Sequence, residues 1–312
     1  MKKVLVIGSF MTDLVVQTDR LPVEGETIIG KSFHQFTGGK GANQAVAAAR
    51  LGGNVEMIGK LGKDDFGKEH IRSLQEAGVQ NQHILFDDHA RTGVGNITLD
   101  NKGSNRIIVV PGANLELNEQ EIEQLEDVIS DADIIVLQLE IPIQTVYKTI
   151  EIAKKYQKKV ILNPAPAQAI DPSFADKVDY IAPNESEAFI LSGIQVEDME
   201  MTRKAADKLL SQGYKNVIIT LGEKGVFFKN QHQEEYIKAY KVEPVDTTAA
   251  GDSFVGAFAY GLSLGWEDKG ALEFAVATSA IAVTRMGAQP SLPTREEVEA
   301  FIQVHEIDEA RV

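Results

Sequence analysis

The chain has 312 residues, of which 43% are hydrophobic and 25% are charged, a globular composition that excludes a disordered or collagen-like chain. The 31 basic and 46 acidic residues give a formal net charge of −15, which leaves no broad basic face for generic binding to nucleic acid or to an anionic membrane. Cysteine is absent, which excludes disulfides, zinc–thiolate sites and a cysteine nucleophile.

The amino-terminal residues 1–8 (MKKVLVIG) are basic and then apolar, like the opening of a signal peptide. The apolar run is only about five residues long, whereas the hydrophobic region of a signal peptide needs roughly 7–15. No apolar stretch approaches the length of about 18 residues that a membrane span requires. We therefore expect a soluble, cytoplasmic protein.

The first half of the chain predicts one buried strand followed by two half-polar β regions. Residues 4–8 form the buried strand, and residues 12–36 form short β pieces broken by Pro22 and Gly25. An alanine-rich segment follows at 42–51. The second β region covers 92–99 and 106–110, joined by a hairpin turn at 100–103. These two β regions fit a small accessory sheet better than they fit β–α–β units.

From residue 122 onward, strand and helix patterns alternate. Ile122, Leu125, Val128 and Ile129 share one helical face. Strands are expected at 134–139, 160–162 and 217–221, and helices at 143–150, 198–212, 251–264 and 269–285. This alternation predicts an α/β fold with a mostly parallel central sheet flanked by helices on both faces. We expect one domain over 1–312.

The most informative segment is residues 246–252 (DTTAAGD), where an extended stretch enters a helix through small residues. Ala249, Ala250 and Gly251 expose backbone N–H groups at the helix amino terminus, which favours an anion. Asp252 would repel a phosphate, but it suits a general base that takes a proton from an attacking hydroxyl. The alternative is that Asp252 serves only as the helix N-cap.

A second segment, residues 38–44 (GGKGANQ), surrounds one lysine with three glycines. It is not a Walker A loop, because the spacing before Lys40 is wrong and no Ser or Thr follows it. The glycines indicate that backbone closely approaches a polar ligand, with Lys40 and Asn43 as donors. The alternative is a tight turn between a strand and a helix, which would need fewer glycines.

Two further segments each allow two interpretations. Asn184 and Glu187 follow a strand-like stretch and can hold a hydrated Mg²⁺ near phosphates. The same pair can form an N-cap and capping box, which this motif alone favours, and both roles can hold together. Residues 220–225 (TLGEKG) favour a hairpin turn over a nucleotide contact. The six histidines show no metal-binding spacing.

Taken together, five segments resemble the ribokinase-like (phosphofructokinase-B) family of sugar and nucleoside kinases, in one order and over essentially the whole chain. They are residues 38–45 (GGKGANQA), 163–166 (NPAP), 183–187 (PNESE), 246–252 (DTTAAGD) and 284–291 (TRMGAQPS). The resemblance implies a β-sheet lid, formed by about 12–36 and 92–110, which closes over the sugar and often forms a homodimer interface. It also implies ATP-dependent phosphorylation of the 5-hydroxyl of D-ribose, with Mg²⁺ and an activating K⁺.

The resemblance also implies a role for each matching residue. Asp252 would be the general base, and Ala249, Ala250 and Gly251 would form an anion hole. The sugar would be held by Asp13, Gly39, Lys40, Gly41, Asn43, Glu140 and Asp252. ATP would face Asn184, Thr220, Gly222, Glu223, Gly225 and Gly251. Glu187 would organise Mg²⁺ through water. The cation K⁺ would be enclosed by Asp246, Thr248, Ala282, Arg285, Gly287 and Ser291.

Two positions depart from the pattern of the family. Met11 stands where many relatives have an asparagine that contacts the sugar, and a thioether cannot donate a hydrogen bond. Val276 stands where many relatives place an asparagine beside the adenine. Two alternatives therefore stay open. One is a kinase of the same family that acts on a deoxyribose, a fructose or a nucleoside. The other is a catalytically silent sugar or nucleotide sensor, against which the presence of Asp252 argues.

Overall fold

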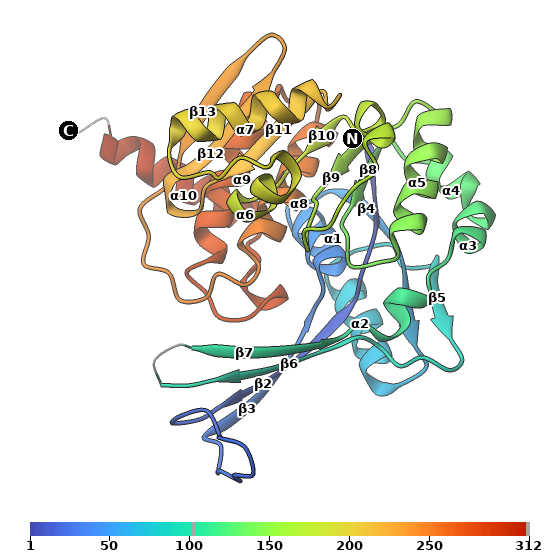
Figure 1. Ribbon diagram of the computed structural model, residues 1–312, viewed down its shortest axis with the longest axis vertical. Coiled ribbons are helices and arrows are strands. Elements are labelled where there is room, and N and C mark those ends of the chain that lie inside the picture. The colour runs from blue at the N-terminus through green and yellow to red at the C-terminus, as the bar shows by residue number, and fades with distance from the viewer. Residues whose placement is uncertain (102–103, 310–312) are drawn as a thin grey trace.

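The computed structural model describes residues 1–101 and 104–309, which form a large sheet between layers of helices and a small sheet that projects from it (Figure 1). The nine strands of the large sheet lie in the order β13 (Glu234–Lys238), β12 (Gly225–Asn230), β11 (Asn216–Thr220), β10 (Tyr180–Ile181), β9 (Lys159–Leu162), β8 (Ile134–Leu137), β1 (Lys3–Ile7), β4 (Asn54–Gly62) and β5 (Ile84–Asp87). The prediction of a mostly parallel central sheet is confirmed, since every neighbouring pair from β5 to β11 is parallel.

Helices cover both faces of the large sheet because alternate residues of its buried strands point to opposite sides. In β1, Val4 and Val6 belong to one hydrophobic cluster and Leu5 and Ile7 to the other. The first cluster takes in α1 (Lys40–Arg50), α2 (Asp65–Glu76), α8 (Ala250–Ser263), α9 (Asp268–Ala282) and α10 (Arg295–Glu309). The second takes in α3 (Glu119–Gln124), α4 (Glu126–Asp131), α5 (Ile143–Lys155), α6 (Glu185–Ser192) and α7 (Met199–Ser211). Short 3₁₀ turns occupy η1 (Gly112–Glu116), η2 (Pro172–Lys177), η3 (Gly222–Lys224) and η4 (Gln289–Ser291).

The large sheet and its helices differ from the prediction in several places, since no element was expected where the structure has β4, α2, β5 and α10. The strands β12 and β13 add an antiparallel hairpin at the edge, which the alternating pattern did not indicate. The expected continuous helix through residues 122–129 is wrong, because Leu125 adopts φ −101° and ψ 18° and separates α3 from α4. Each of the two short helices still has one fully buried apolar residue, Ile122 in α3 and Ile129 in α4.

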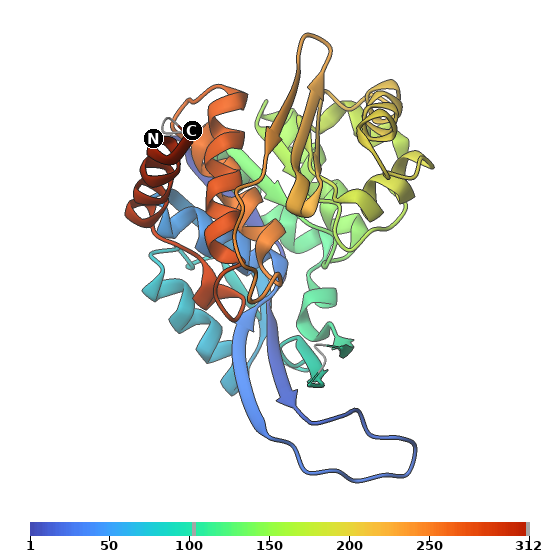
Figure 2. The same ribbon diagram turned by 90° about the vertical axis from the view of Figure 1, so that its left-hand side faces the viewer.

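The small sheet contains the strands β3 (Ser32–Gly38), β2 (Met11–Gln17), β6 (Val94–Leu99) and β7 (Asn105–Val110), in that order. The predicted accessory sheet is therefore confirmed, while Lys102 and Gly103 of the predicted turn lie outside the described residues. Figure 2 shows the β2–β3 hairpin extending away from the large sheet. No helix within the described residues is both long enough and apolar enough to cross a membrane.

Candidate active site

Asp252 lies in the first turn of α8 with its side chain turned into the protein, so that the residue is only 5% exposed. Asn43 Nδ2 donates to its Oδ2 at 2.9 Å, and Gln44 Nε2 donates to its Oδ1 at 3.0 Å. The N-cap of α8 is Ala249, so the alternative in which Asp252 merely caps the helix is wrong. The carboxylate instead connects the start of α8 to α1.

The charge of Asp252 is balanced between opposing effects. Burial raises the pKa of this carboxyl, whereas the positive charge of Lys40 and the hydrogen bonds from Asn43 and Gln44 act to lower it. The same attraction to Asp252 raises the pKa of Lys40. A carboxylate whose ionised form is opposed by burial and supported by three nearby groups is suited to accept a proton during a reaction.

The turn from β3 to α1 delivers Lys40 and Asn43 to this carboxylate. Gly39 has φ 91°, and a Cβ there would come within 2.6 Å of the backbone nitrogen of Met11. A Cβ on Gly41 would come within 2.5 Å of the nitrogen of Ser9. These two glycines therefore allow α1 to pack against residues 8–11 of its own chain. Both glycines are thus required by the tight turn between β3 and α1, whether or not a ligand also approaches them.

The amide of Asn43 is already tied to Asp252 by one hydrogen of Nδ2, and its second hydrogen remains for the predicted role as a donor to a ligand. The Oδ1 atom has no hydrogen-bond partner in the described part of the chain. Asn43 therefore also offers an acceptor, and an acceptor beside a donor suits a hydroxyl group of a ligand.

A pocket of about 200 Å³ opens beside Asp252 at the carboxyl ends of the parallel strands. Its walls include Lys40, Asn163, Asn184, Glu187, Thr220, Thr247, Thr248, Gly251 and Asp252. A Cβ on Gly251 would meet no described atom within 4 Å, so the first turn of α8 is open at this point. Free backbone N–H groups at a helix start attract anions, and this pocket therefore suits a phosphate.

Asn184 and Glu187 form the predicted capping box at the start of α6. Each side chain accepts a hydrogen bond from the other residue's backbone nitrogen, both at 2.8 Å. Burial raises the pKa of Glu187, while the charge of Lys40 lowers it. Glu187 nevertheless also lines the pocket, so the capping role and a pocket-facing position occur together. Among the described residues, no group of three His, Asp or Glu side chains could by itself hold a metal ion.

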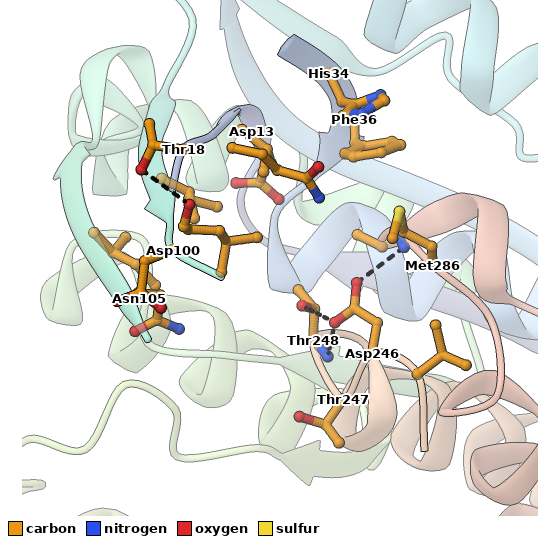
Figure 3. A pocket seen from close by; sticks show the side chains of 18 of the residues that line it. Asp13, Thr18, His34, Phe36, Asp100, Asn105, Asp246, Thr247, Thr248 and Met286 are labelled. Atoms are coloured by element: carbon orange, nitrogen blue, oxygen red, sulfur yellow. Dashed lines mark hydrogen bonds between the residues drawn. The ribbon is translucent and has the colours of Figure 1, made fainter. Parts of the chain in front are cut away.

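A larger pocket of about 710 Å³ lies between the small sheet and the loop before α8. Figure 3 shows Asp13, His34 and Phe36 on one wall and Asp246, Thr247 and Thr248 on the other. Thr247 and Thr248 also line the smaller pocket, so the two pockets adjoin.

Asp13 is the acidic group of the small sheet in this pocket. Burial, followed by the charges of Glu140, Asp246 and Asp252, raises its pKa to about 7. Met11 lies two residues away on the same face of β2 and is buried. A Cβ on Gly95 of β6 would lie 2.7 Å from Asp13 Oδ1 and 3.8 Å from Met11 Cγ, so the missing side chain leaves room beside both residues.

Glu140 and Asp246 join segments that are far apart in the sequence. Glu140 Oε2 accepts hydrogen bonds from the backbone nitrogen of Lys40, at 3.0 Å, and from the Ser9 hydroxyl. Asp246 accepts from the Thr248 backbone nitrogen and the Gly287 backbone nitrogen, both at 2.9 Å. Asp246 therefore ties the loop before α8 to the loop after α9.

Several of the other predicted residues lie apart from the two pockets formed by the described residues. Val276 is buried in the hydrophobic cluster around α9. The residues Gly222, Glu223 and Gly225 belong to the turn from β11 to β12, which confirms the hairpin interpretation. Ala282 and Ser291 are buried, and the Arg285 side chain pairs with Glu297 at 2.6 Å.

Sequence reasoning missed a group of buried amides behind Asp252. Gln44 donates to Asn163 Oδ1 as well as to Asp252, and it accepts a hydrogen bond from Gln138. Gln44 and Asn163 belong to segments that the sequence analysis used for the family resemblance, but neither was given a role. The only local signal was an amide residue in a segment that otherwise reads as buried, namely Gln138 between Leu137 and Leu139.

Comparison with known proteins finds ribokinases both by sequence and by structure. Residues 1–295 match the sequence pattern described as pfkB family carbohydrate kinase. The chain is 39% identical to a deoxyribokinase of Salmonella typhi, over 97% of this chain and 99% of that protein. It is 40% identical to a ribokinase of Haemophilus influenzae, over 97% and 99% of the two chains. The structure of Arabidopsis thaliana ribokinase complexed with ribose and ATP superposes with a TM-score of 0.92 at 33% identity, covering 96% of this chain and 98% of that one.

Proposed function

The chain belongs to the pfkB family of carbohydrate kinases and is an ATP-dependent sugar kinase, and we propose that it phosphorylates the 5-hydroxyl of D-ribose to give D-ribose 5-phosphate. The observation that carries this proposal is the buried carboxylate of Asp252, which lines the smaller pocket, next to the larger one, at the open start of α8. In the relative from Arabidopsis thaliana, ribose and ATP are the bound molecules.

In the reaction that we propose, Asp252 takes the proton of the primary hydroxyl as the oxygen attacks the γ-phosphorus of ATP. The new O–P bond forms while the bond from the γ-phosphorus to the bridging oxygen of the β-phosphate breaks, and ADP leaves. The N–H groups of Ala249 and Gly251 would stabilise the negative charge on the transferring group, whereas the N–H of Ala250, predicted to share this role, already donates to the Thr247 carbonyl at 3.2 Å. The carboxylate alone provides the base, so its loss would remove turnover more than binding.

The larger pocket would hold the sugar and the smaller one the phosphates. Asp13 of the larger pocket and Lys40 of the smaller one would bind the hydroxyls of the sugar, together with Glu140 and the unpartnered Oδ1 of Asn43, which line neither pocket. Gly39 and Gly41 shape the turn that presents Lys40. Asn184, Thr220 and Gly251 line the pocket proposed for the phosphates. The adenosine would extend past the turn that contains Gly222, Glu223 and Gly225 toward Val276.

The residues present also fit the two cations of the proposal. Glu187 would orient a hydrated Mg²⁺, which prefers oxygen ligands and keeps several waters, so a cage of protein carboxylates is not needed. Mg²⁺ supplies charge neutralisation to the phosphates. A K⁺ ion would lie between the loops that Asp246 joins, near Thr248, Ala282, Arg285, Gly287 and Ser291. The carboxylate of Asp246 and nearby backbone carbonyls provide hard oxygen ligands there.

We further propose a homodimer that forms through the outer face of the small sheet. Phe36 and Ile107 line the larger pocket and therefore lie on the inner face of the small sheet. Because side chains alternate between the two faces of a strand, Phe33, Ile108 and Val110 lie on the outer face. These three residues are 60%, 67% and 59% exposed. Exposed apolar side chains gathered on one face favour association with another protein surface.

We place the reaction in the cytoplasm, where ATP is available as phosphoryl donor.

Met11 supports 2-deoxy-D-ribose as a second candidate substrate. Its apolar side chain lies on the same face of β2 as Asp13, which lines the proposed sugar site, and it cannot donate a hydrogen bond to a hydroxyl. A sugar that lacks one hydroxyl leaves no polar group unsatisfied against such a side chain. One relative, the Salmonella typhi protein, bears the name deoxyribokinase.

Release of ADP, measured with D-ribose, 2-deoxy-D-ribose, D-fructose and a nucleoside in the presence of Mg²⁺ and K⁺, tests the proposal. A kcat/KM for one of the two pentoses that exceeds the values for fructose and the nucleoside supports a pentose kinase. The ratio between the two pentoses decides between the two candidates. A higher value for fructose or the nucleoside contradicts the assignment, and activity on none of the four would favour a sensor.

A further inference from the structure

The side chain of Gln44 is completely buried, yet it is connected to Asp252 and to two other amides. Its Nε2 donates to Asp252 Oδ1 at 3.0 Å and to Asn163 Oδ1 at 3.1 Å. Its Oε1 accepts from Gln138 Nε2 at 2.6 Å. An amide nitrogen carries two hydrogens, and both have an acceptor here. The hydrogen-bonding capacity of this nitrogen is therefore fully used.

The orientation of Gln44 is fixed from both ends of the group. Asn163 Nδ2 donates to the backbone oxygen of Ala182 at 3.0 Å, so Asn163 Oδ1 must face Gln44. On the other side, Gln138 presents a donor to Gln44 Oε1. A rotation of the Gln44 amide by 180° would place its oxygen against two acceptors, Asp252 and Asn163, and its nitrogen against a donor. Gln138 Oε1 has no partner among the described residues, but the amide atoms of Gln44 itself are all satisfied, so Gln44 holds one orientation.

We infer that Gln44 is a positioning residue for Asp252, whose orientation it fixes and whose ionised form it supports. This inference rests on the proposed function, in which Asp252 is the base. Asn43 occupies Oδ2 and Gln44 occupies Oδ1, each with one hydrogen bond. The lone pairs that remain on the carboxylate therefore have fixed directions, so that one can point at the hydroxyl of the substrate.

Gln44 supports Asp252 in a different way from its neighbour Asn43. Asn43 carries an unpartnered oxygen and stands in the proposed sugar site, whereas Gln44 is 0% exposed and its amide atoms are all engaged. Changes at Gln44 should therefore alter kcat and leave the KM for the sugar nearly unchanged. Changes at Asn43 should alter both constants.

The groups that face Asp252 determine how its titration responds. Lys40 and the two amides favour the ionised form, whereas burial and Glu140 oppose it. Asp13 and Glu187 also act on Asp252 through their charges. A carboxyl in place of the Gln44 amide would remove one supporting donor and add an acidic group next to Asp252. Two carboxyls that share one site cannot both ionise readily.

The experiment compares kcat as a function of pH, with saturating pentose and ATP, for the wild type, Gln44→Glu and Gln44→Leu. In Gln44→Glu the pH at which kcat falls on the acid side should rise by at least about one unit. In Gln44→Leu, kcat should fall about tenfold or more, since a hydrogen bond to a charged group is lost, while the KM for the sugar changes less than about threefold. Gln120→Glu adds the same charge on exposed α3 and should keep the wild-type profile.

Asp252→Asn serves as the reference variant. If Asp252→Asn is inactive and both Gln44 variants keep the wild-type pH profile and kcat, the inference about Gln44 is wrong and the proposed function stands. If Asp252→Asn keeps near wild-type kcat, the proposed function itself fails.

If Gln44→Glu does not fold, as judged by circular dichroism, Gln138→Met carries the test. That variant removes the donor to Gln44 at nearly constant side-chain volume. It should shift the acid side of the profile upward by a smaller amount, and an unchanged profile would overturn the inference.

Discussion

Asn43 donates a hydrogen bond to Asp252 across 209 residues of sequence, while its own carbonyl oxygen has no partner in the described part of the chain. The Asn43 side chain is only 4% exposed, and buried polar atoms are nearly always hydrogen-bonded. The missing partner is therefore expected to arrive with a ligand. A sugar hydroxyl that donates to Asn43 would lie next to Asp252, the group proposed to remove a proton from the substrate.

Asp13 is predicted to lower the free energy of unfolding of the sugar-free protein and to strengthen sugar binding. Its folded-state pKa of about 7 exceeds its usual value of 3.8, so the free energy of unfolding decreases as the pH rises from about 4 to about 7. Asp13→Asn should be more stable than the wild type at pH 8 by at least about 1 kcal/mol, because one pH unit between folded and unfolded pKa is worth about 1.4 kcal/mol.

Urea unfolding of both proteins without sugar, at pH 8 and at pH 5, measures this effect. The difference between the variant and the wild type should shrink at pH 5, and the variant should bind the sugar more weakly. A variant that is no more stable than the wild type at pH 8 would show that Asp13 is not destabilised by its surroundings.

Met11→Asn is predicted to change the choice between the two pentoses. The amide would supply a donor and an acceptor in place of the thioether beside Asp13. The ratio of kcat/KM for D-ribose to that for 2-deoxy-D-ribose should rise about fivefold or more, the worth of roughly one hydrogen bond. The ratio cancels any general loss of activity. An unchanged ratio would mean that Met11 does not face the hydroxyl that distinguishes the two sugars.

The fold was predicted from the sequence where local patterns suffice. Apolar runs such as Ile134 to Leu137 correctly predicted the buried parallel strands, and the small residues before Asp252 correctly predicted where a helix begins. The hairpin turn at residues 220–225 was predicted, but the strands β12 and β13 that follow it were missed, since no βαβ pattern marks an added antiparallel pair. The break at Leu125 was missed because its apolar spacing still fits one helix.

Much of the site could not be predicted because it depends on contacts between distant segments. The bonds from Asn43 and Gln44 to Asp252 join residues more than 200 positions apart, and no local spacing encodes them. Gly39 and Gly41 were interpreted as ligand-facing, although their main neighbours are residues 8–11 of the same chain. The contact with residues 8–11 forms only when α1 packs against β1 and β2, so the local sequence does not indicate it.

Potassium is predicted to activate the enzyme through the loops that Asp246 joins. In KCl, kcat should exceed its value in NaCl of equal ionic strength by about fivefold, the low end of a typical coupling between two sites. Asp246→Asn should reduce this difference, because the substitution removes the charge that attracts the cation. Equal rates in the two salts for the wild type would remove the cation from the proposed function.

Association through the small sheet is predicted to depend on Ile108. A charge placed in a buried apolar contact is strongly unfavourable, so Ile108→Glu should convert a dimer into a monomer. Val304→Glu on α10, where the side chain is 56% exposed, is the matched control and should leave the mass unchanged. Light scattering after size exclusion measures both. A monomeric wild type, or a dimeric Ile108→Glu, would contradict the proposed interface.

The most direct test of the account is the turnover of Asp252→Asn. The substitution keeps the shape of the side chain and removes its ability to take a proton, and the loss of a positioned base lowers rates by about 10²–10⁴. We predict that kcat with the preferred pentose decreases by a factor of about 10²–10⁴, while calorimetry still detects binding of the sugar and of ATP. A kcat close to that of the wild type would show that Asp252 is not the base.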